Sequence, residues 1–184
     1  MISERAKSLM NSMLIQGMRS ALLRPEDEVV SLGEVASIEP VSEKEMVMLS
    51  VASYEFRLLI MIYFDRDPAT LAHFAGKTRL SAEAMDNRMF DDAISECGNL
   101  CCGTFNRELG RAFTHIGMST PNIIDSRCAE HLTLLKYGHL QHFELLLQSG
   151  VRFRLSMCAC EYKDLDFELD TPAVAETTGE LEFL

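Results

Sequence analysis

Three polar residues near the middle of the chain have types and spacings that could perform chemistry. Asp92, Glu96 and Asn99 are separated by four and three positions, so on a helix they share one face. A carboxylate can pair with a cation, and the carboxamide of Asn99 offers both a donor and an acceptor with which to orient a water molecule. Gly103 and Asn106 continue the same ridge at spacings of four and three. The pattern predicts a polar ridge that could position water beside a charged partner.

The helix expected to carry this ridge spans about residues 82–110. Its opposite face is an apolar stripe, the side that should meet a sheet: Met89, Phe90, Ile94, Cys97, Cys101, Phe105 and Leu109. Any amphipathic helix presents polar residues to solvent, so spacing alone leaves open a solvated face without function. Gly103 in mid-helix costs about 1 kcal/mol relative to Ala. Its benefit would be a flat spot where another backbone can approach closely.

The run from Asp92 to Gly103, followed by Pro121, resembles the signature of the CheX/CheC/FliY family of chemotaxis phosphatases. That signature is Asp or Ser, three residues, Glu, two residues, Asn, and a Pro after about twenty-one more residues. Here twenty-one residues separate Asn99 from Pro121. The resemblance covers roughly residues 29–162, and the single Glu-x-x-Asn motif makes the chain CheX-like.

The resemblance implies a phosphatase that hydrolyses the aspartyl phosphate of a CheY-like response-regulator receiver domain, as in chemotaxis signalling. Glu96 and Asn99 would be catalytic: Asn99 orients water, and Glu96 pairs with the receiver's Lys. The expected supporting or partner-binding residues are Asp92, Gly103, Asn106 and Pro121. No cofactor of its own is implied, since Mg²⁺ would sit on the receiver, and a homodimer is expected. The alternative is a non-enzymatic CheC-like module that binds a receiver domain or a flagellar switch component.

The elements that must position these residues follow from the hydrophobic pattern. It predicts helices at about 3–23, 67–74 and 82–110, and strands at 29–38, 46–52, 54–64, 113–118, 131–136, 140–147 and 151–160. Pro121 should open a loop, and Ser149-Gly150 should form a tight turn. This order predicts an α/β (α+β) fold, a two-layer domain with helices packed on a largely antiparallel, CheC/CheX-like sheet.

The charge of the chain is strongly negative and concentrated at one end. The formal net charge is −11, which argues against nucleic acid or a membrane as the main partner. Residues 161–184 carry −7 of it. We therefore expect one domain over residues 1–170 and an acidic C-terminal tail over 171–184. The tail could dock a basic partner, but a solvated end without fixed structure is the commoner outcome.

The cysteines and the N-terminus indicate the compartment. Residues 1–24 mix charges with apolar residues and resemble no signal peptide, so a cytoplasmic location is expected, where disulfides are rare. Six cysteines are present, without the C-x₂₋₄-C loops of structural zinc sites. Cys97 and Cys101 on the long helix, and Cys158 and Cys160 on the last strand, are instead expected to pack in the core, and no metal site is predicted.

Overall fold

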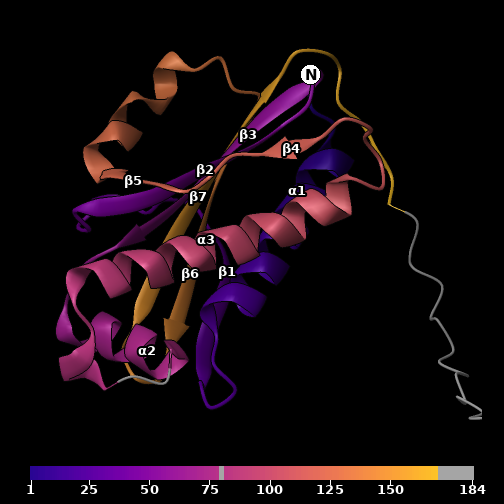
Figure 1. Ribbon diagram of the computed structural model, residues 1–184. Coiled ribbons are helices and arrows are strands. Elements are labelled where there is room, and N and C mark those ends of the chain that lie inside the picture. The colour runs from indigo at the N-terminus through magenta and orange to yellow at the C-terminus, as the bar shows by residue number, and fades with distance from the viewer. Residues whose placement is uncertain (79–80, 170–184) are drawn as a thin grey trace, which may run out of the picture.

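The computed structural model describes residues 1–78 and 81–169 (Figure 1). In chain order its elements are α1 (Glu4–Leu22), β1 (Val29–Val35), β2 (Glu45–Ala52), β3 (Phe56–Phe64), α2 (Pro68–Thr78), η1 (Ala82–Ala84), α3 (Asn87–Leu109), β4 (Gly117–Met118), β5 (Asn122–Asp125), η2 (Ser126–Leu134), β6 (His139–Leu147) and β7 (Arg152–Glu161). The expected acidic tail lies outside the described residues.

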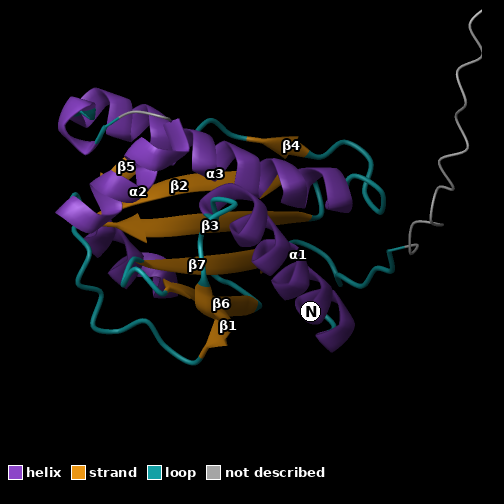
Figure 2. Ribbon diagram, turned by 90° about the horizontal axis from the view of Figure 1, so that it is seen from below, coloured by secondary structure: helices purple, strands orange, loops and turns teal. Residues whose placement is uncertain are grey.

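Within the described residues, the strands form one seven-stranded sheet in the order β1-β6-β7-β3-β2-β4, with β5 also paired to β2. Every strand pairing is antiparallel. Figure 2 shows the strands side by side beneath the helices, from β4 and β5 at one edge to β1 at the other. The predicted two-layer α+β architecture is confirmed.

The three helices α1, α2 and α3 cover one face of this sheet, here called the front face (Figures 1 and 2). Alternate strand residues point to it, so Leu58, Ile60 and Ile62 of β3 join the main core with Phe90, Ile94 and Phe105 of α3. Cys97 and Cys101 are buried in the same core, as expected for small apolar side chains. The front face therefore holds α3 by apolar packing along most of its length.

The opposite face, here called the back face, is covered by η2 and by residues 36–44 between β1 and β2. A second apolar cluster forms there, including Ile38, Met46, Met61, Tyr63, Cys158 and Cys160. Sheets with two covered faces bury strands on both sides, and β7 is accordingly buried from Phe153 to Cys160. The predicted burial of Cys158 and Cys160 is confirmed.

Helix α1 fixes the position of α3 through a close crossing. Gly17 of α1 lies against Cys101 of α3, where a Cβ would come within 2.9 Å of the Cys101 carbonyl oxygen. The Cys97 thiol also donates to the carbonyl oxygen of Ala21, at 3.2 Å. The apolar stripe of the predicted N-terminal helix therefore packs within the fold.

Several predicted elements were wrong in type or extent. Residues 131–136 are not a strand: the 3₁₀ helix η2 runs through residue 134, started by Asp125, whose side chain accepts from the backbone N–H of Arg127 at 2.9 Å. Pro121 does not open a loop, because β5 begins at the next residue and pairs with β2. The strand expected at 113–118 shrinks to Gly117–Met118.

The remaining predictions are close to the observed elements. The turn at Ser149-Gly150 is confirmed, with Gly150 at φ +85° and the N–H of Leu147 bonded to the oxygen of Val151 at 2.9 Å. Among the described residues, no helix combines the length and apolarity needed to cross a bilayer.

Candidate functional site

Helix α3 begins later than its apolar pattern suggested, for a local reason. Asp86 is the N-cap, and its side chain accepts from the N–H of Met89 at 2.8 Å, which satisfies one of the free donors of the first turn. The short turn η1 precedes it as a separate element. Met89, expected on the buried stripe, is 44% exposed, whereas its neighbour Phe90 is fully buried in the core.

The middle of α3 rests directly on β2. Gly98 faces the sheet, where an added Cβ would lie 2.7 Å from Leu49 and 2.8 Å from Val47. The helix axis can approach β2 this closely only because residue 98 has no side chain. Glu96 and Asn99 flank this contact in sequence, so the same contact that seats the helix also sets their height above the sheet.

Glu96 and Asn99 lie next to one another on the outer side of α3. The Nδ2 of Asn99 donates to Oε2 of Glu96 over 3.4 Å, a long and therefore weak bond. Glu96 is exposed and Asn99 is half-buried. The structure thus brings the two predicted catalytic residues together within reach of a partner, and in the described part of the chain neither side chain makes a stronger bond.

The other predicted residues of the ridge differ in exposure. Asp92 is exposed, whereas Gly103 and Asn106 are half-buried. A Cβ on Gly103 would meet nothing within 4 Å, so the flat spot expected there is present. Asn106 was expected to point outward, but its Oδ1 is buried and makes no hydrogen bond within the described part of the chain. The ridge therefore turns inward toward its C-terminal end.

Pro121 lies beside the part of β2 on which α3 rests. Pro121 directly precedes Asn122, the first residue of β5, and Asn122 pairs with Met48 of β2. On its other side, Ser119 is fixed to Ser50: the Ser119 N–H donates to the Ser50 oxygen, and the Ser50 N–H donates to Ser119 Oγ, both at 2.9 Å. Pro121 is therefore held between two anchored points on the strand that supports Gly98.

A charged cluster that the sequence reasoning missed fixes the N-terminal half of α3. The Nη2 of Arg66, just after β3, donates to Asp91 at 2.6 Å and to Glu45 at 3.1 Å. Its guanidinium also lies 5.1 Å from the ring centroid of Phe90, a cation–π distance. Because Nε of Arg66 also donates to Glu45, at 2.7 Å, the pairing with Glu45 is bidentate. Bidentate Arg pairing gives orientation as well as energy, so Arg66 fixes the end of α3 that leads into the ridge.

The two glycines of α3 give a paired test of this arrangement. Both Gly98→Ala and Gly103→Ala gain about 1 kcal/mol of helix propensity. Only Gly98→Ala forces a methyl group into β2, and overpacking of this kind costs about 1–3 kcal/mol. We therefore expect Gly103→Ala to be more stable than the unmodified protein and Gly98→Ala to be less stable than Gly103→Ala by about 1–3 kcal/mol, as measured by urea denaturation. Equal stability of the two variants would contradict the contact described for Gly98.

The fold has relatives among solved structures. A chain of the CheX–CheY–BeF₃–Mg²⁺ complex from Borrelia burgdorferi matches at a TM-score of 0.61 with 17% identity, covering 84% of this chain and 97% of that one. Chemotaxis protein CheX from Vibrio vulnificus matches at 0.56 with 13% identity, covering 82% and 96%. A CheC-like superfamily protein from a Shewanella species matches at 0.55 with 10% identity, covering 86% and 99%.

At the level of sequence, no family model matches the chain, and a comparison with curated proteins finds no relative. At 10–17% identity the structural matches establish the fold. The chain has the CheX/CheC-like fold of chemotaxis proteins, which is the fold that its Glu-x-x-Asn signature predicted.

Proposed function

We propose that this protein is a CheX-like phosphatase that hydrolyses the aspartyl phosphate of a CheY-like receiver domain. The observation that carries the proposal is the pairing of Glu96 with Asn99 on the open side of α3, at 3.4 Å, in a CheX/CheC-like fold. The long spacing to Pro121 supports it, because Pro121 lies beside the strand under α3. The structural relative from Borrelia burgdorferi forms a complex with CheY.

Asn99 would supply the element of the reaction that a receiver lacks. Phosphoryl transfer depends on in-line positioning and charge stabilisation, with little covalent work for the protein. The receiver contributes its own Mg²⁺ and Lys, so this chain needs no metal. An amide can hold a water through both its N–H and its C=O. Fixing that water removes translational and rotational entropy from the barrier.

Glu96 would dock the receiver in register with Asn99. In the free protein its carboxylate accepts only the long bond from Asn99 among the described residues. Pairing with the receiver's Lys would replace that bond with a stronger, charge-assisted one. The Asn99 amide would then be released toward the water. Such an interfacial pair contributes mainly orientation and specificity, which is what an in-line reaction requires.

The shape of the ridge fits a close approach by another protein. Gly103 leaves open space one turn beyond Asn99, although the helix gives up about 1 kcal/mol of propensity there. Asp92 is exposed one turn before Glu96. We assign Asp92, Gly103, Asn106 and Pro121 to support of the docking surface.

The activity is tested by mixing the purified protein with receiver domains phosphorylated by acetyl phosphate and following loss of the phosphate. We expect acceleration over the receiver's own dephosphorylation. Binding is measured in parallel with the receiver held in its BeF₃⁻–Mg²⁺ form, which mimics the phosphorylated state. Binding to that form without any acceleration would contradict the phosphatase proposal and favour a non-enzymatic receiver-binding module.

A further inference from the structure

The back face of the sheet contains a pocket, far in sequence from the ridge on α3. Its volume is about 440 Å³, within the range of small-molecule sites. The pocket lies between η2 and residues 38–41, over strands β3 and β6. Apolar side chains from both sides line it, including Ile38, Val41, Leu132 and Leu140.

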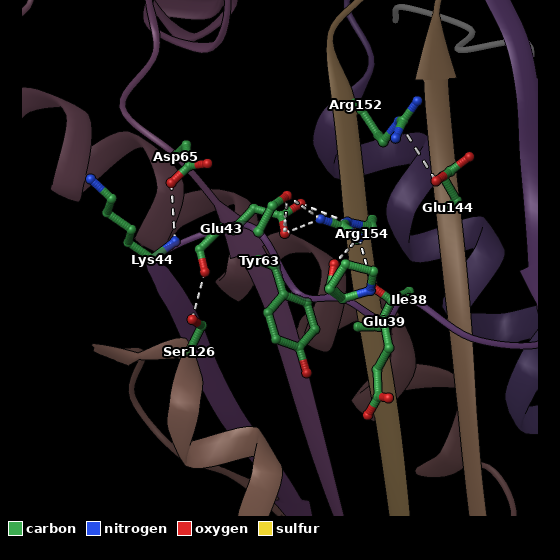
Figure 3. Close-up of polar contacts among 12 residues, drawn as sticks. Ile38, Glu39, Glu43, Lys44, Tyr63, Asp65, Ser126, Glu144, Arg152 and Arg154 are labelled. Atoms are coloured by element: carbon green, nitrogen blue, oxygen red, sulfur yellow. Dashed lines mark hydrogen bonds and ion pairs between the residues drawn. The ribbon is translucent and has the colours of Figure 1, made fainter.

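One wall of the pocket is fixed by a buried arginine (Figure 3). From β7, Arg154 donates to the carbonyl oxygens of Ile38 at 2.6 Å and Pro40 at 3.2 Å, and to Ser42 Oγ at 2.6 Å. It also forms an ion pair with Glu43, and each side chain is only 10% exposed. The loop between β1 and β2 is therefore held to the sheet at four residues between 38 and 43.

The other wall is tied to the first one. Ser126 is the first residue of η2. Its hydroxyl donates to the main-chain carbonyl oxygen of Glu43 at 2.5 Å, and its N–H donates to the main-chain carbonyl oxygen of Lys44 at 3.0 Å. Both walls are thus joined at the Glu43–Lys44 segment, which Figure 3 shows beside Tyr63. A pocket whose walls are fixed before a ligand arrives loses little entropy on binding.

The floor of the pocket carries an ordered chain of hydrogen bonds. The hydroxyl of Tyr63, which is 1% exposed, donates to Ser156 Oγ at 3.2 Å. Ser156 Oγ lies 2.7 Å from Nδ1 of His142. Burial lowers the pKa of His142, so its ring is neutral at pH 7. Ser156 Oγ accepts from Tyr63, and we infer that its own hydrogen is donated onward to Nδ1, which places the ring proton of His142 on Nε2.

His142 lines the pocket. Its Nε2–H makes no hydrogen bond within residues 1–78 and 81–169, so it is available to a ligand. Successive hydrogen bonds polarise one another, so this terminal donor is stronger than that of an isolated imidazole. A ligand in the pocket would therefore present a hydrogen-bond acceptor to His142.

The charges at the pocket favour a cation. Glu39 and Glu130 both line it and are exposed. The lining also contains Arg127, but Arg127 is paired with Asp125 at 2.7 Å. Hydrogen bonds from Arg127 hold the pKa of Asp125 at about 2, so this pair contributes no net positive charge at neutral pH. With Glu39 and Glu130 added to this neutral pair, the pocket lining carries a net negative charge.

From this geometry we propose that the pocket binds a small organic amine with an apolar body, a hydrogen-bond acceptor that meets His142 and a protonated amino group that meets Glu39 and Glu130. The site is independent of the proposed phosphatase function, because its residues lie on the back face of the sheet, whereas α3 lies on the front face (Figure 1).

Three probes with the same phenol body and different charges test this proposal: tyramine, 4-ethylphenol and 3-(4-hydroxyphenyl)propanoate. Dissociation constants are measured by ¹H–¹⁵N chemical-shift titration of the full-length protein. We expect tyramine to bind about fivefold more tightly than the anion, the ratio that corresponds to about 1 kcal/mol for a pair of exposed charges. The proposal is overturned if none of the three probes binds at a concentration of about 10 mM, which would detect even very weak binding.

Two sets of variants assign any binding to this pocket. Thr133→Trp, at an exposed residue that lines the pocket, should block it, whereas His131→Trp, exposed on the same η2 but not lining it, should bind tyramine normally. In the Glu39→Gln, Glu130→Gln double variant, the preference for tyramine over 4-ethylphenol should disappear. Unchanged binding in Thr133→Trp, or an unchanged preference in the double variant, overturns the proposal. None of these variants touches α3, so the receiver assay stays a separate measurement.

Discussion

Replacing Asn99 with Ala is expected to reduce the acceleration of receiver dephosphorylation by about 100-fold, with little loss of affinity for the BeF₃⁻–Mg²⁺ receiver. The amide contributes position to an attacking water, and a misplaced nucleophile costs about two orders of magnitude in rate. Asn99 is half-buried and its Nδ2 contacts Glu96 at 3.4 Å, a weak bond, so its loss should leave α3 intact.

The matched control is Asn87→Ala, at an exposed asparagine that begins the same helix. It should retain the full rate. Glu96→Gln should behave differently from both variants, because it removes the charge that docks the receiver's Lys: its apparent affinity should fall along with its rate. If Asn99→Ala dephosphorylates the receiver as fast as the unmodified protein, Asn99 does not position the water.

Replacing Glu43 with Ala is expected to destabilise the protein by about 3–5 kcal/mol. The substitution leaves the guanidinium of Arg154 buried at 8% residue exposure, without its carboxylate partner. It also weakens the clamp on Ile38 and Pro40, because the same guanidinium holds both carbonyl oxygens. The free energy of unfolding from urea denaturation measures the effect.

A second ion pair, which also uses an arginine of β7, supplies the control. Arg152 and Glu144 lie 3.7 Å apart with side chains 54% and 27% exposed, and both pairs are visible in Figure 3. Glu144→Ala should cost about 0–1 kcal/mol, as surface pairs do. The double variant Glu43→Leu, Arg154→Met should recover much of the lost stability, since apolar replacements often match a buried pair. Similar losses for Glu43→Ala and Glu144→Ala would show that burial does not set the value of the Arg154 pair.

The sequence predicted the parts of the site that depend on local pattern. Helical spacing placed Glu96 and Asn99 on one face of α3, and strand alternation identified most of the sheet. The sequence also contains capping residues that mark the starts of η2 and α3, but the apolar patterns around 131–136 and 82–110 favoured a strand and an earlier helix start. Asp125 and Asp86 are each N-caps, and weighing them would have corrected both boundaries.

Other features depend on partners that no local pattern reveals. Strand β5 exists because the edge of β2 offers free backbone groups to residues 122–125. The contact between Arg154 and Glu43 joins residues 111 positions apart. Polar residues inside the apolar run 151–160 were the available signal: Arg154 and Ser156 interrupt it, and buried polar groups require partners.

The pairing of β3 with β7 has a consequence for how the molecule acquires its structure. These central strands join residues as far apart as Phe56 and Glu161, and such non-local pairing slows folding to milliseconds or longer. Until β7 is in place, β3 lacks its inner neighbour, and the surface beneath α3 is only the β2–β3 hairpin with its short edge strands. We expect the ridge of α3 to become ordered late, in a single cooperative transition, and a fragment ending before β7 to lack a stably packed α3.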